Sequence, residues 1–208
     1  IEKYFSKILE YCPYLTNYRL SINTTNSFPH SSGIASSASG MSALSLCILS
    51  FENDLIDLSN EEYFYQKASF LSRIGSGSAC RSIYGGVNLG GANDEFKNSS
   101  DLYSIRLKEN ISSNFNNYRD TILIIDDNEK EVSSSVGHEL MNEHPFSELR
   151  FSQAFENISK LNLILKSGNL HEFCLLVESE ALILHSLMMS SDPSYLLMKS
   201  ETLSVIDE

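Results

Sequence analysis

Hydrophobic spacing changes its period several times within the first fifty residues. Residues 1–11 place apolar side chains on one face at the spacing of an amphipathic helix. Residues 18–23 alternate apolar and polar side chains, which is typical of a half-buried strand. Small residues at 26–33 then indicate a loop, and helical spacing returns over 35–49. The pattern therefore predicts a strand, a small-residue loop and a helix in succession.

The middle of the chain mixes a helix with short strands. After turn residues at 57–60, apolar positions predict a second amphipathic helix that ends near Gly75. The segment 75–82 is too rich in glycine and serine for regular structure. Short strands are predicted at 85–89 and 102–107, with a polar surface connection between them.

The second half of the chain is predominantly helical in pattern. The apolar run 121–125 predicts a buried strand. Helices over about 145–167 and 169–190 are predicted to meet at Gly168, because glycine often ends a helix, and a third helix follows the turn at 192–193. Strands and helices do not alternate strictly, so the pattern favours an α+β fold over a doubly wound sheet.

A domain boundary is predicted near Tyr118, which divides the chain into domains at 1–118 and 119–208. The chain starts without Met, inside a helical pattern, so we expect it to be truncated at its front.

Composition narrows the functional classes. The net charge of −12 and a pI near 4.8 argue against a nucleic-acid or anionic-membrane surface, so local donors must hold any anionic ligand. The four cysteines are far apart and no apolar run reaches membrane-spanning length, which favours a cytoplasmic protein without a disulfide framework. The five histidines include no i, i+4 pair, so the sequence predicts no helical zinc site.

The first candidate for ligand chemistry is P-H-S-S-G-I-A-S-S-A at 29–38, a small-residue loop that leads into a helix. Backbone N–H groups and the helix dipole at such a place bind phosphate, and small side chains let its oxygens approach. Ser36 and Ser37 can add hydroxyl contacts to phosphate or to magnesium. The alternative is that these serines cap the helix, which is the commoner role of serine there.

The second candidate is G-S-G-S-A-C-R-S at 75–82. Arg81 offers a planar fork of donors suited to carboxylate or phosphate. The alternative is a surface turn with a solvated arginine. Two anion-binding candidates within one acidic domain favour a ligand site, and we expect Ser37 and Arg81 to face one shared cleft.

These motifs resemble those of one enzyme family. N-S-F-P-H-S-S-G-I-A-S-S-A-S-G at 26–40 resembles the ATP-binding loop of diphosphomevalonate decarboxylases, and G-S-G-S-A-C-R-S-I-Y-G-G at 75–86 resembles their substrate loop. A third match covers 129–138. The resemblance implies the two-domain α+β architecture of the GHMP kinase superfamily. Its N-terminal part is like ribosomal S5 domain 2 and its helix-rich C-terminal part is ferredoxin-like, and both are expected to be incomplete here.

The resemblance also implies a reaction. ATP, with magnesium, would phosphorylate the 3-hydroxyl of mevalonate 5-diphosphate, after which phosphate and carbon dioxide leave to give isopentenyl diphosphate in the mevalonate pathway of isoprenoid biosynthesis. The catalytic aspartate of the family lies in a D-A-G-P-N segment that this chain lacks, so we expect the isolated fragment to be inactive. A homodimer is a further expectation from the family.

Site residues follow from the same resemblance. Arg81 is expected to bind the substrate carboxylate, while Ser76 and Ser78 bind its diphosphate. Ser37 is also expected to be a magnesium ligand. The residues expected to bind ATP are Pro29, Gly33, Ala35, Ser36, Ser37 and Ser134.

Two alternative functions stay open at this point. One is another small-molecule kinase of the superfamily, which would lack the 75–82 loop in this form. The other is a non-catalytic fragment that binds a ligand without turnover. Ser135 stands where many bacterial relatives have an arginine thought to hold the substrate diphosphate, and serine removes that charge. His30 lies in the first loop without a pattern that gives it a role.

Overall fold

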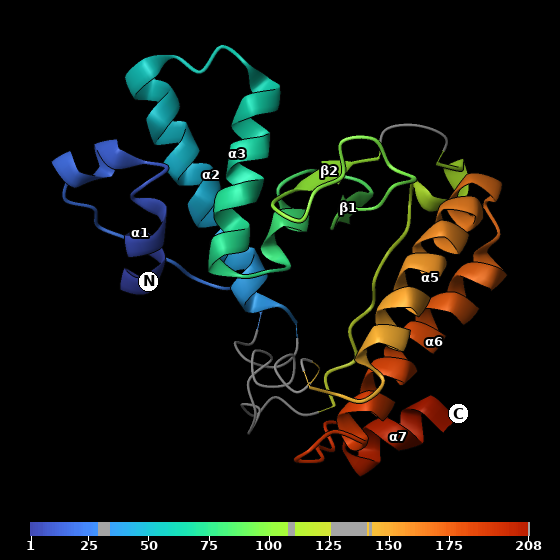
Figure 1. The fold of residues 1–208 in the computed structure, drawn as a ribbon. Coiled ribbons are helices and arrows are strands. Elements are labelled where there is room, and N and C mark those ends of the chain that lie inside the picture. Colours follow the sequence, from blue (N-terminus) through green and yellow to red (C-terminus); the bar gives the residue numbers. More distant parts are fainter. Residues whose placement is uncertain (29–33, 108–110, 126–140, 142, 208) are drawn as a thin grey trace. The chain divides into compact units, whose positions relative to one another are not determined.

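The computed structural model describes residues 1–28, 34–107, 111–125, 141 and 143–207. The chain divides into two compact units, Ile1–Lys108 and Glu109–Glu208. Helices dominate the described part of both units, and the first also contains a two-stranded antiparallel sheet (Figure 1). The fold is therefore α+β, as predicted. Within the described ranges, no helix combines the length and apolar character needed to cross a membrane.

The first unit combines helices with short 3₁₀ turns and two short strands. The strands pair with Gly90 opposite Ser104. All predicted helices of this unit are confirmed, and so are its last two strands, although each strand is shorter than predicted. The elements are α1 (Glu2–Ile8), η1 (Pro13–Asn17), α2 (Ser36–Ile56), α3 (Glu61–Gly75), η2 (Ala79–Ser82), β1 (Asn88–Gly90) and β2 (Ser104–Arg106).

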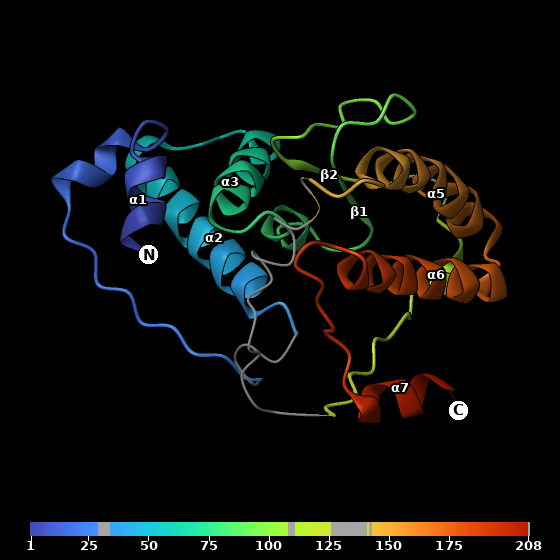
Figure 2. The ribbon, with the colours of Figure 1, turned by 60° about the horizontal axis from the view of Figure 1, so that its bottom comes forward.

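Helices α2 and α3 form an antiparallel hairpin, and both views show them side by side (Figures 1 and 2). Its connection is defined by two asparagine side chains. Asn53 Oδ1 accepts a hydrogen bond from the Leu58 N–H at 2.8 Å, just beyond the end of α2. Asn60 Oδ1 accepts from the Tyr63 N–H at 3.1 Å and caps α3, while Glu61 in the first turn complements the helix dipole. The turn of the hairpin is therefore short and is held by two side-chain hydrogen bonds.

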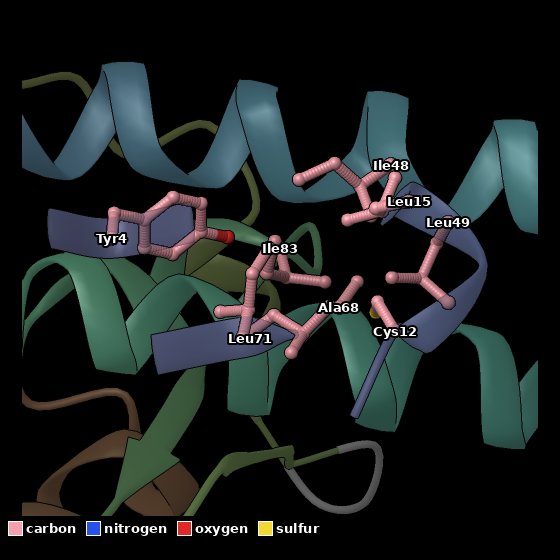
Figure 3. Packing of buried hydrophobic residues seen from close by; sticks show 9 residues of the cluster. Tyr4, Cys12, Leu15, Ile48, Leu49, Ala68, Leu71 and Ile83 are labelled. Atoms are coloured by element: carbon pink, nitrogen blue, oxygen red, sulfur yellow. The ribbon is translucent and has the colours of Figure 1, made fainter. Parts of the chain in front are cut away.

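The hydrophobic core of the first unit lies where α1, α2 and α3 meet (Figure 3). Ile8, Leu49 and Leu71 come from these three helices and are fully buried. A helix as short as α1 is not stable alone in water, so its burial against the hairpin must hold it in place. The buried cluster consists of Tyr4, Ile8, Cys12, Leu15, Ile48, Leu49, Ala68, Leu71 and Ile83.

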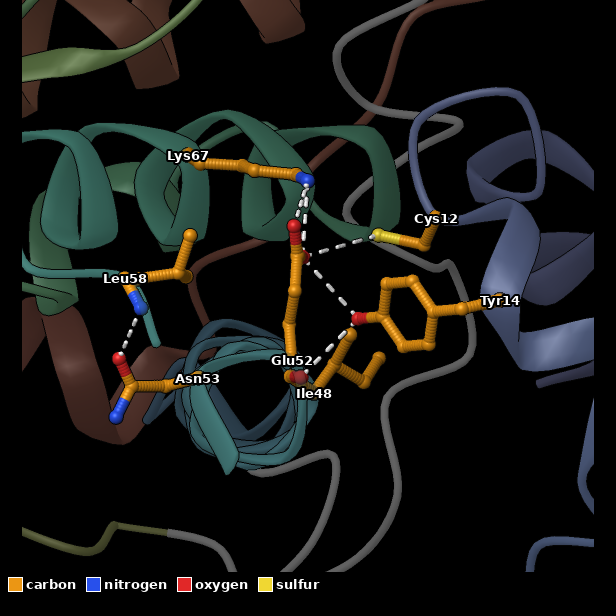
Figure 4. Close-up of polar contacts among 7 residues, drawn as sticks. All are labelled: Cys12, Tyr14, Ile48, Glu52, Asn53, Leu58 and Lys67. Atoms are coloured by element: carbon orange, nitrogen blue, oxygen red, sulfur yellow. Dashed lines mark hydrogen bonds and ion pairs between the residues drawn. The ribbon is translucent and has the colours of Figure 1, made fainter. Parts of the chain in front are cut away.

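A buried ion pair joins α2 to α3 beside this core (Figure 4). Lys67 Nζ lies 2.6 Å from Glu52 Oε1, and the two side chains are only 13% and 6% exposed. Glu52 Oε2 also accepts a hydrogen bond from the Tyr14 hydroxyl at 3.2 Å and lies 4.0 Å from the Cys12 sulfur. Burial raises the pKa of Cys12, so its thiol stays protonated and is a poor nucleophile. Glu52 thereby connects the start of the chain to the hairpin.

The second unit is a helical hairpin with a further short helix. The first long helix ends at Gly168, whose φ of 77° is left-handed and suits glycine, so the predicted helix stop is confirmed. Asn169 Oδ1 accepts from the Glu172 N–H at 3.2 Å and caps the next helix. The elements are η3 (Ser113–Phe115), α5 (Ser147–Ser167), α6 (Leu170–Met189) and α7 (Ser200–Asp207).

The segment 112–118 packs on this hairpin. Asn114 Nδ2 donates a hydrogen bond to the Gly168 carbonyl at 2.8 Å, and the ring centroids of Tyr118 and Phe173 are 5.3 Å apart. These contacts place the segment in the second compact unit. The division between the two compact units therefore lies before Tyr118. The domain boundary near Tyr118 stays a prediction.

Two predicted strands are wrong. Residues 18–23 and 121–125 pair with no strand in the described part of the chain. Their apolar side chains are exposed, with 46% for Leu20 and 64% for Leu123. A strand requires a neighbour that satisfies its backbone groups, and neither segment has one among the described residues.

The Glu52–Lys67 pair yields a stability prediction. We expect Lys67→Met to lower the free energy of unfolding by about 3–5 kcal/mol, because it leaves a buried carboxylate without its cation. The double variant Glu52→Gln/Lys67→Met should lose less, since the glutamine oxygen still accepts from Tyr14 and no charge is left behind. Urea denaturation of both variants measures this, and a double variant less stable than Lys67→Met would contradict the assignment.

An ion pair with an added amide joins the two long helices of the second unit. Arg150 Nη2 lies 2.6 Å from Glu180 Oε2, and Asn157 Nδ2 donates to Glu180 Oε1 at 2.6 Å. Burial alone would raise the pKa of the Glu180 carboxyl. The hydrogen bonds from Arg150 and Asn157 outweigh burial and hold that pKa below its ordinary value of 4.5.

A depressed folded-state pKa stabilises the fold above the ordinary carboxyl pKa, and this stabilisation is lost as pH falls through the lower folded value. Glu180→Gln should therefore lower the free energy of unfolding at pH 7 by about 1 kcal/mol or less, because the pair is partly solvated. Below pH 4.5 the difference from the wild type should shrink. Urea titrations at pH 7 and at pH 3.5 measure it, and an equal difference at both would contradict the assigned pairing.

Candidate functional site

The α2–α3 hairpin brings the described end of the first candidate segment, at the start of α2, next to the second loop. Because the helices run antiparallel, the first turn of α2 lies beside the end of α3, where the second loop begins (Figure 1). Ser37 Oγ lies 3.4 Å from Ser76 Oγ. Gly75 permits this approach, since a Cβ there would collide with the side chain of Met41. Helix η2, which carries Arg81, also packs against α2.

The start of α2 has the features of an anion site. The helix begins at Ser36, directly after Ala35, whose φ of 55° is left-handed. Ser36 and Ser37 lie within the first turn and do not cap this helix end, and no described side chain does. For the other serines of the loop, Ser31 and Ser32, the capping alternative falls outside the described residues. Ser37 is exposed. An exposed hydroxyl next to the N–H groups of a helix start favours phosphate.

The glycine–serine loop, residues 75–82, is held by a hydrogen bond from Arg73, which precedes the motif. Arg73 Nη1 donates to the Gly77 carbonyl at 3.0 Å and lies 3.6 Å from Cys80 Sγ. Cys80 is fully buried, and its thiol donates to the Gly77 carbonyl at 3.3 Å. The second half of the loop forms the 3₁₀ turn η2 (Ala79–Ser82), so the prediction of an irregular segment is correct only for the first half.

Arg81 presents its guanidinium at the surface of η2. The backbone N–H of Arg81 donates to the Ser78 carbonyl at 3.1 Å, and the aliphatic part of its side chain lies against Gly90. No described residue forms an ion pair or hydrogen bond with the guanidinium. Ser76 and Ser78 are half-buried in the same loop. The planar fork of Arg81 is therefore available to a carboxylate or phosphate.

Several predicted residues fall outside the described ranges. Pro29, Gly33 and Ser134 are among them, as are His30 and Ser135. Their roles therefore stay predictions.

The described residues give little support to a metal site or to a histidine-activated serine nucleophile. They contain no group of three or more His, Cys, Asp or Glu side chains that could hold a metal ion. His144 Nδ1 accepts from the Phe146 N–H at 3.1 Å, so the neutral ring carries its hydrogen on Nε2 and donates to Ser190 Oγ at 3.1 Å. This direction is opposite to that of a base activating a serine nucleophile.

A hollow in the first unit is lined in part by residues 83–85, the end of the second motif. Three tyrosines, Tyr65, Tyr84 and Tyr103, line it together with Glu62 and Arg106. Burial raises the pKa of Tyr84, so that phenol stays protonated at neutral pH. None of the predicted ligand-binding residues lines this hollow.

Sequence patterns missed Arg73, Ser69 and Ser104, which all support the glycine–serine loop from within. One available signal was Ser69, which stands among the apolar positions of a predicted helix. A hydroxyl on a buried helix face needs a partner. Ser104 gave no signal, because its role depends on strand pairing.

Comparison with known proteins finds relatives in one enzyme family. Residues 1–101 match the family model described as the diphosphomevalonate decarboxylase-like N-terminal domain. The diphosphomevalonate decarboxylase of Saccharomyces cerevisiae is 34% identical over 134 residues, which cover 62% of this chain and 30% of the relative. The first 101 of this chain's 208 residues thus match the N-terminal domain of this enzyme family. The enzyme ERG19 of Gibberella zeae is 32% identical over 156 residues, covering 74% of this chain and 37% of the relative.

Solved structures of mevalonate diphosphate decarboxylases share the fold. That from Legionella pneumophila has a TM-score of 0.69 and 28% identity, and the match covers 88% of this chain and 53% of that chain. A structure of MDDEF in complex with MVAPP, AMPPCP and magnesium has a TM-score of 0.64 and 27% identity, over 86% and 52% of the two chains. The predicted GHMP kinase-like α+β fold is thereby confirmed. The chain spans about half the length of these solved decarboxylases.

Arg73 is bonded within the loop and the Arg81 guanidinium is not, so their alanine variants should differ in free energy of unfolding. We expect Arg81→Ala to change the free energy of unfolding by less than about 0.5 kcal/mol, because its guanidinium has no partner among the described residues. Arg73→Ala should cost about 1–2 kcal/mol, since the Gly77 carbonyl loses a charged donor. Urea denaturation measures both, and the reverse order would show that the two roles are misassigned.

Proposed function

We propose that the protein carrying this chain is an ATP-dependent diphosphomevalonate decarboxylase, a lyase of isoprenoid biosynthesis. ATP phosphorylates the 3-hydroxyl of mevalonate 5-diphosphate, and loss of phosphate and carbon dioxide gives isopentenyl diphosphate. Similarity to the diphosphomevalonate decarboxylases supports this reaction. The related structure that holds MVAPP, AMPPCP and magnesium supports ATP as the phosphate donor and magnesium as the metal cofactor. A homodimer and a cytoplasmic location remain predictions.

The contact between Ser37 and Ser76 carries the proposal. It joins the helix start assigned to ATP with the loop assigned to the substrate. Phosphoryl transfer depends mainly on holding the donor phosphate and the accepting hydroxyl in line and within reach. Two anion sites side by side on one hairpin supply that arrangement.

The ATP side of the site uses backbone groups and hydroxyls. Ala35, Ser36 and Ser37 are assigned to the ATP phosphates, with Pro29, Gly33 and Ser134 completing the predicted set. Ser37 fits a magnesium ligand, because its hydroxyl is exposed and its hydrogen-bond partner among the described residues is another hydroxyl, that of Ser76. Magnesium, when bound, neutralises phosphate charge.

The substrate side uses Arg81 for the carboxylate, and Ser76 and Ser78 for the diphosphate. A planar fork that binds the carboxylate in two places fixes the orientation of the carbon–carbon bond that breaks. As the phosphate leaves C3, the electrons of that bond form the new double bond and carbon dioxide departs. The protein contributes position and charge to this step.

Removal of the Arg81 guanidinium tests the assignment. In the intact protein that carries this sequence, we expect Arg81→Ala to lower kcat/KM for mevalonate 5-diphosphate roughly 10- to 150-fold, the worth of one charge-assisted hydrogen-bond pair. Arg81→Lys should recover only part of this loss, because lysine keeps the charge without the fork. The measurement is release of carbon dioxide from carboxyl-labelled substrate with ATP and magnesium.

The control is Arg19→Ala, which removes an exposed arginine of the same unit outside both loops. Unaltered kinetics for Arg81→Ala would reject the assigned role. ATP consumption without carbon dioxide release by the wild type would instead favour the kinase alternative.

A further inference from the structure

Two buried serines from different elements bind the backbone carbonyl of Cys80. Ser69 Oγ, on α3, donates to this oxygen at 3.0 Å, and the Ser104 hydroxyl, on β2, donates to the same oxygen. The Ser104 N–H donates to Ser69 Oγ at 2.9 Å. Each hydroxyl has a single hydrogen, which it gives to the carbonyl. The 3.2 Å approach of the two hydroxyl oxygens is therefore held by the other bonds.

This network is shielded from solvent. Ser69, Ser104 and Cys80 each have an exposed fraction of 0%. Hydrogen bonds are stronger in such surroundings, and a buried carbonyl without a donor is costly. Loss of both hydroxyls would leave the Cys80 carbonyl without either side-chain donor. The network therefore defines one position for that carbonyl.

The Cys80 carbonyl belongs to the same peptide unit as the Arg81 N–H. Because the peptide unit is planar and rigid, a fixed oxygen also fixes the direction of the N–H. That N–H donates to the Ser78 carbonyl at 3.1 Å. The backbone from which the Arg81 side chain leaves is therefore fixed, although its guanidinium is exposed.

The strand pair adds a second contact on the same face. Gly90 of β1 stands opposite Ser104 of β2, and directly opposed positions share one face of a sheet. A Cβ at Gly90 would lie 3.3 Å from Arg81 Cγ, so the stem of Arg81 rests on the glycine. The opposed residues Gly90 and Ser104 thus contact neighbouring parts of the loop: Ser104 binds the Cys80 carbonyl, and Gly90 contacts the Arg81 side chain.

We propose that Ser69 and Ser104 are positioning residues that direct Arg81 toward its ligand, with Gly90 as the surface on which its stem rests. The kinetic consequence rests on the proposed function, which assigns Arg81 to the substrate carboxylate. Both serines are fully buried, so they act through the Cys80–Arg81 peptide unit and do not touch the ligand.

The test compares Ser69→Ala, Ser104→Ala and the double variant in the intact protein. Ser72→Ala is the matched control, because Ser72 is on the same helix, is equally buried and bonds to the Ser69 carbonyl of that helix at 2.8 Å. Two quantities are measured: hydrogen exchange of the amides at 76–82 by mass spectrometry, and kcat/KM for carbon dioxide release.

The double variant should raise the exchange rates of these amides at least about tenfold, because local opening becomes easier. It should also lower kcat/KM roughly 10- to 100-fold through misplacement of Arg81. Ser72→Ala should change neither quantity. In an Arg81→Ala background the serine substitutions should cause no further loss of kcat/KM, since the group that they position is gone.

Gly90→Val provides a second route that keeps both serines, and valine suits a strand. Its side chain would meet the Arg81 stem and the Cys80 sulfur, so it should displace the stem and lower kcat/KM while both serines still bind the Cys80 carbonyl. Unchanged exchange in the serine double variant, or a full further loss of kcat/KM in the Arg81→Ala background, would overturn the inference. A wild type that releases no carbon dioxide would reject the proposed function, and the exchange rates alone would then decide whether the serines fix the loop.

Discussion

The buried ion pair between Glu52 and Lys67 sets how α2 lies against α3, and the candidate site depends on that pairing. The pair lies toward the closed end of the hairpin, while the Gly75–Met41 approach lies at its open end. Sliding one helix by a single turn, about 5.4 Å, would break both contacts and separate Ser37 from Ser76. The same carboxylate binds Tyr14, so the start of the chain is held by the interaction that aligns the site.

The proposed site must bind anions in an acidic chain, and it has few positive charges with which to do so. The chain carries a net charge of −12, yet its proposed ligands are anions. The groups proposed to bind these anions are hydroxyls, the N–H groups of a helix start and one guanidinium that has no partner among the described residues. A second arginine, Arg73, is used within the loop and does not compete for the ligand. Local donors can therefore bind phosphate within an acidic protein.

The sequence predicted the elements whose signals are local. Helical spacing and Gly168 located the helices of both units, and the loop motifs identified the residues around Ser37 and Arg81. The alternation at 18–23 failed because strand formation depends on a neighbouring strand that periodicity does not reveal. The supports of the loop, Ser69 and Ser104, were missed for the same reason, since their contact joins a helix to a strand pair distant in sequence.

The central claim is that the start of α2 and the 75–82 loop bind the two substrates side by side. A crystal structure of the intact protein with AMPPCP, magnesium and mevalonate 5-diphosphate tests it most directly. The account predicts nucleotide phosphate oxygens at Ser36 and Ser37, and the mevalonate carboxylate in contact with the Arg81 guanidinium. Either ligand bound elsewhere, with Arg81 still facing solvent, would contradict it.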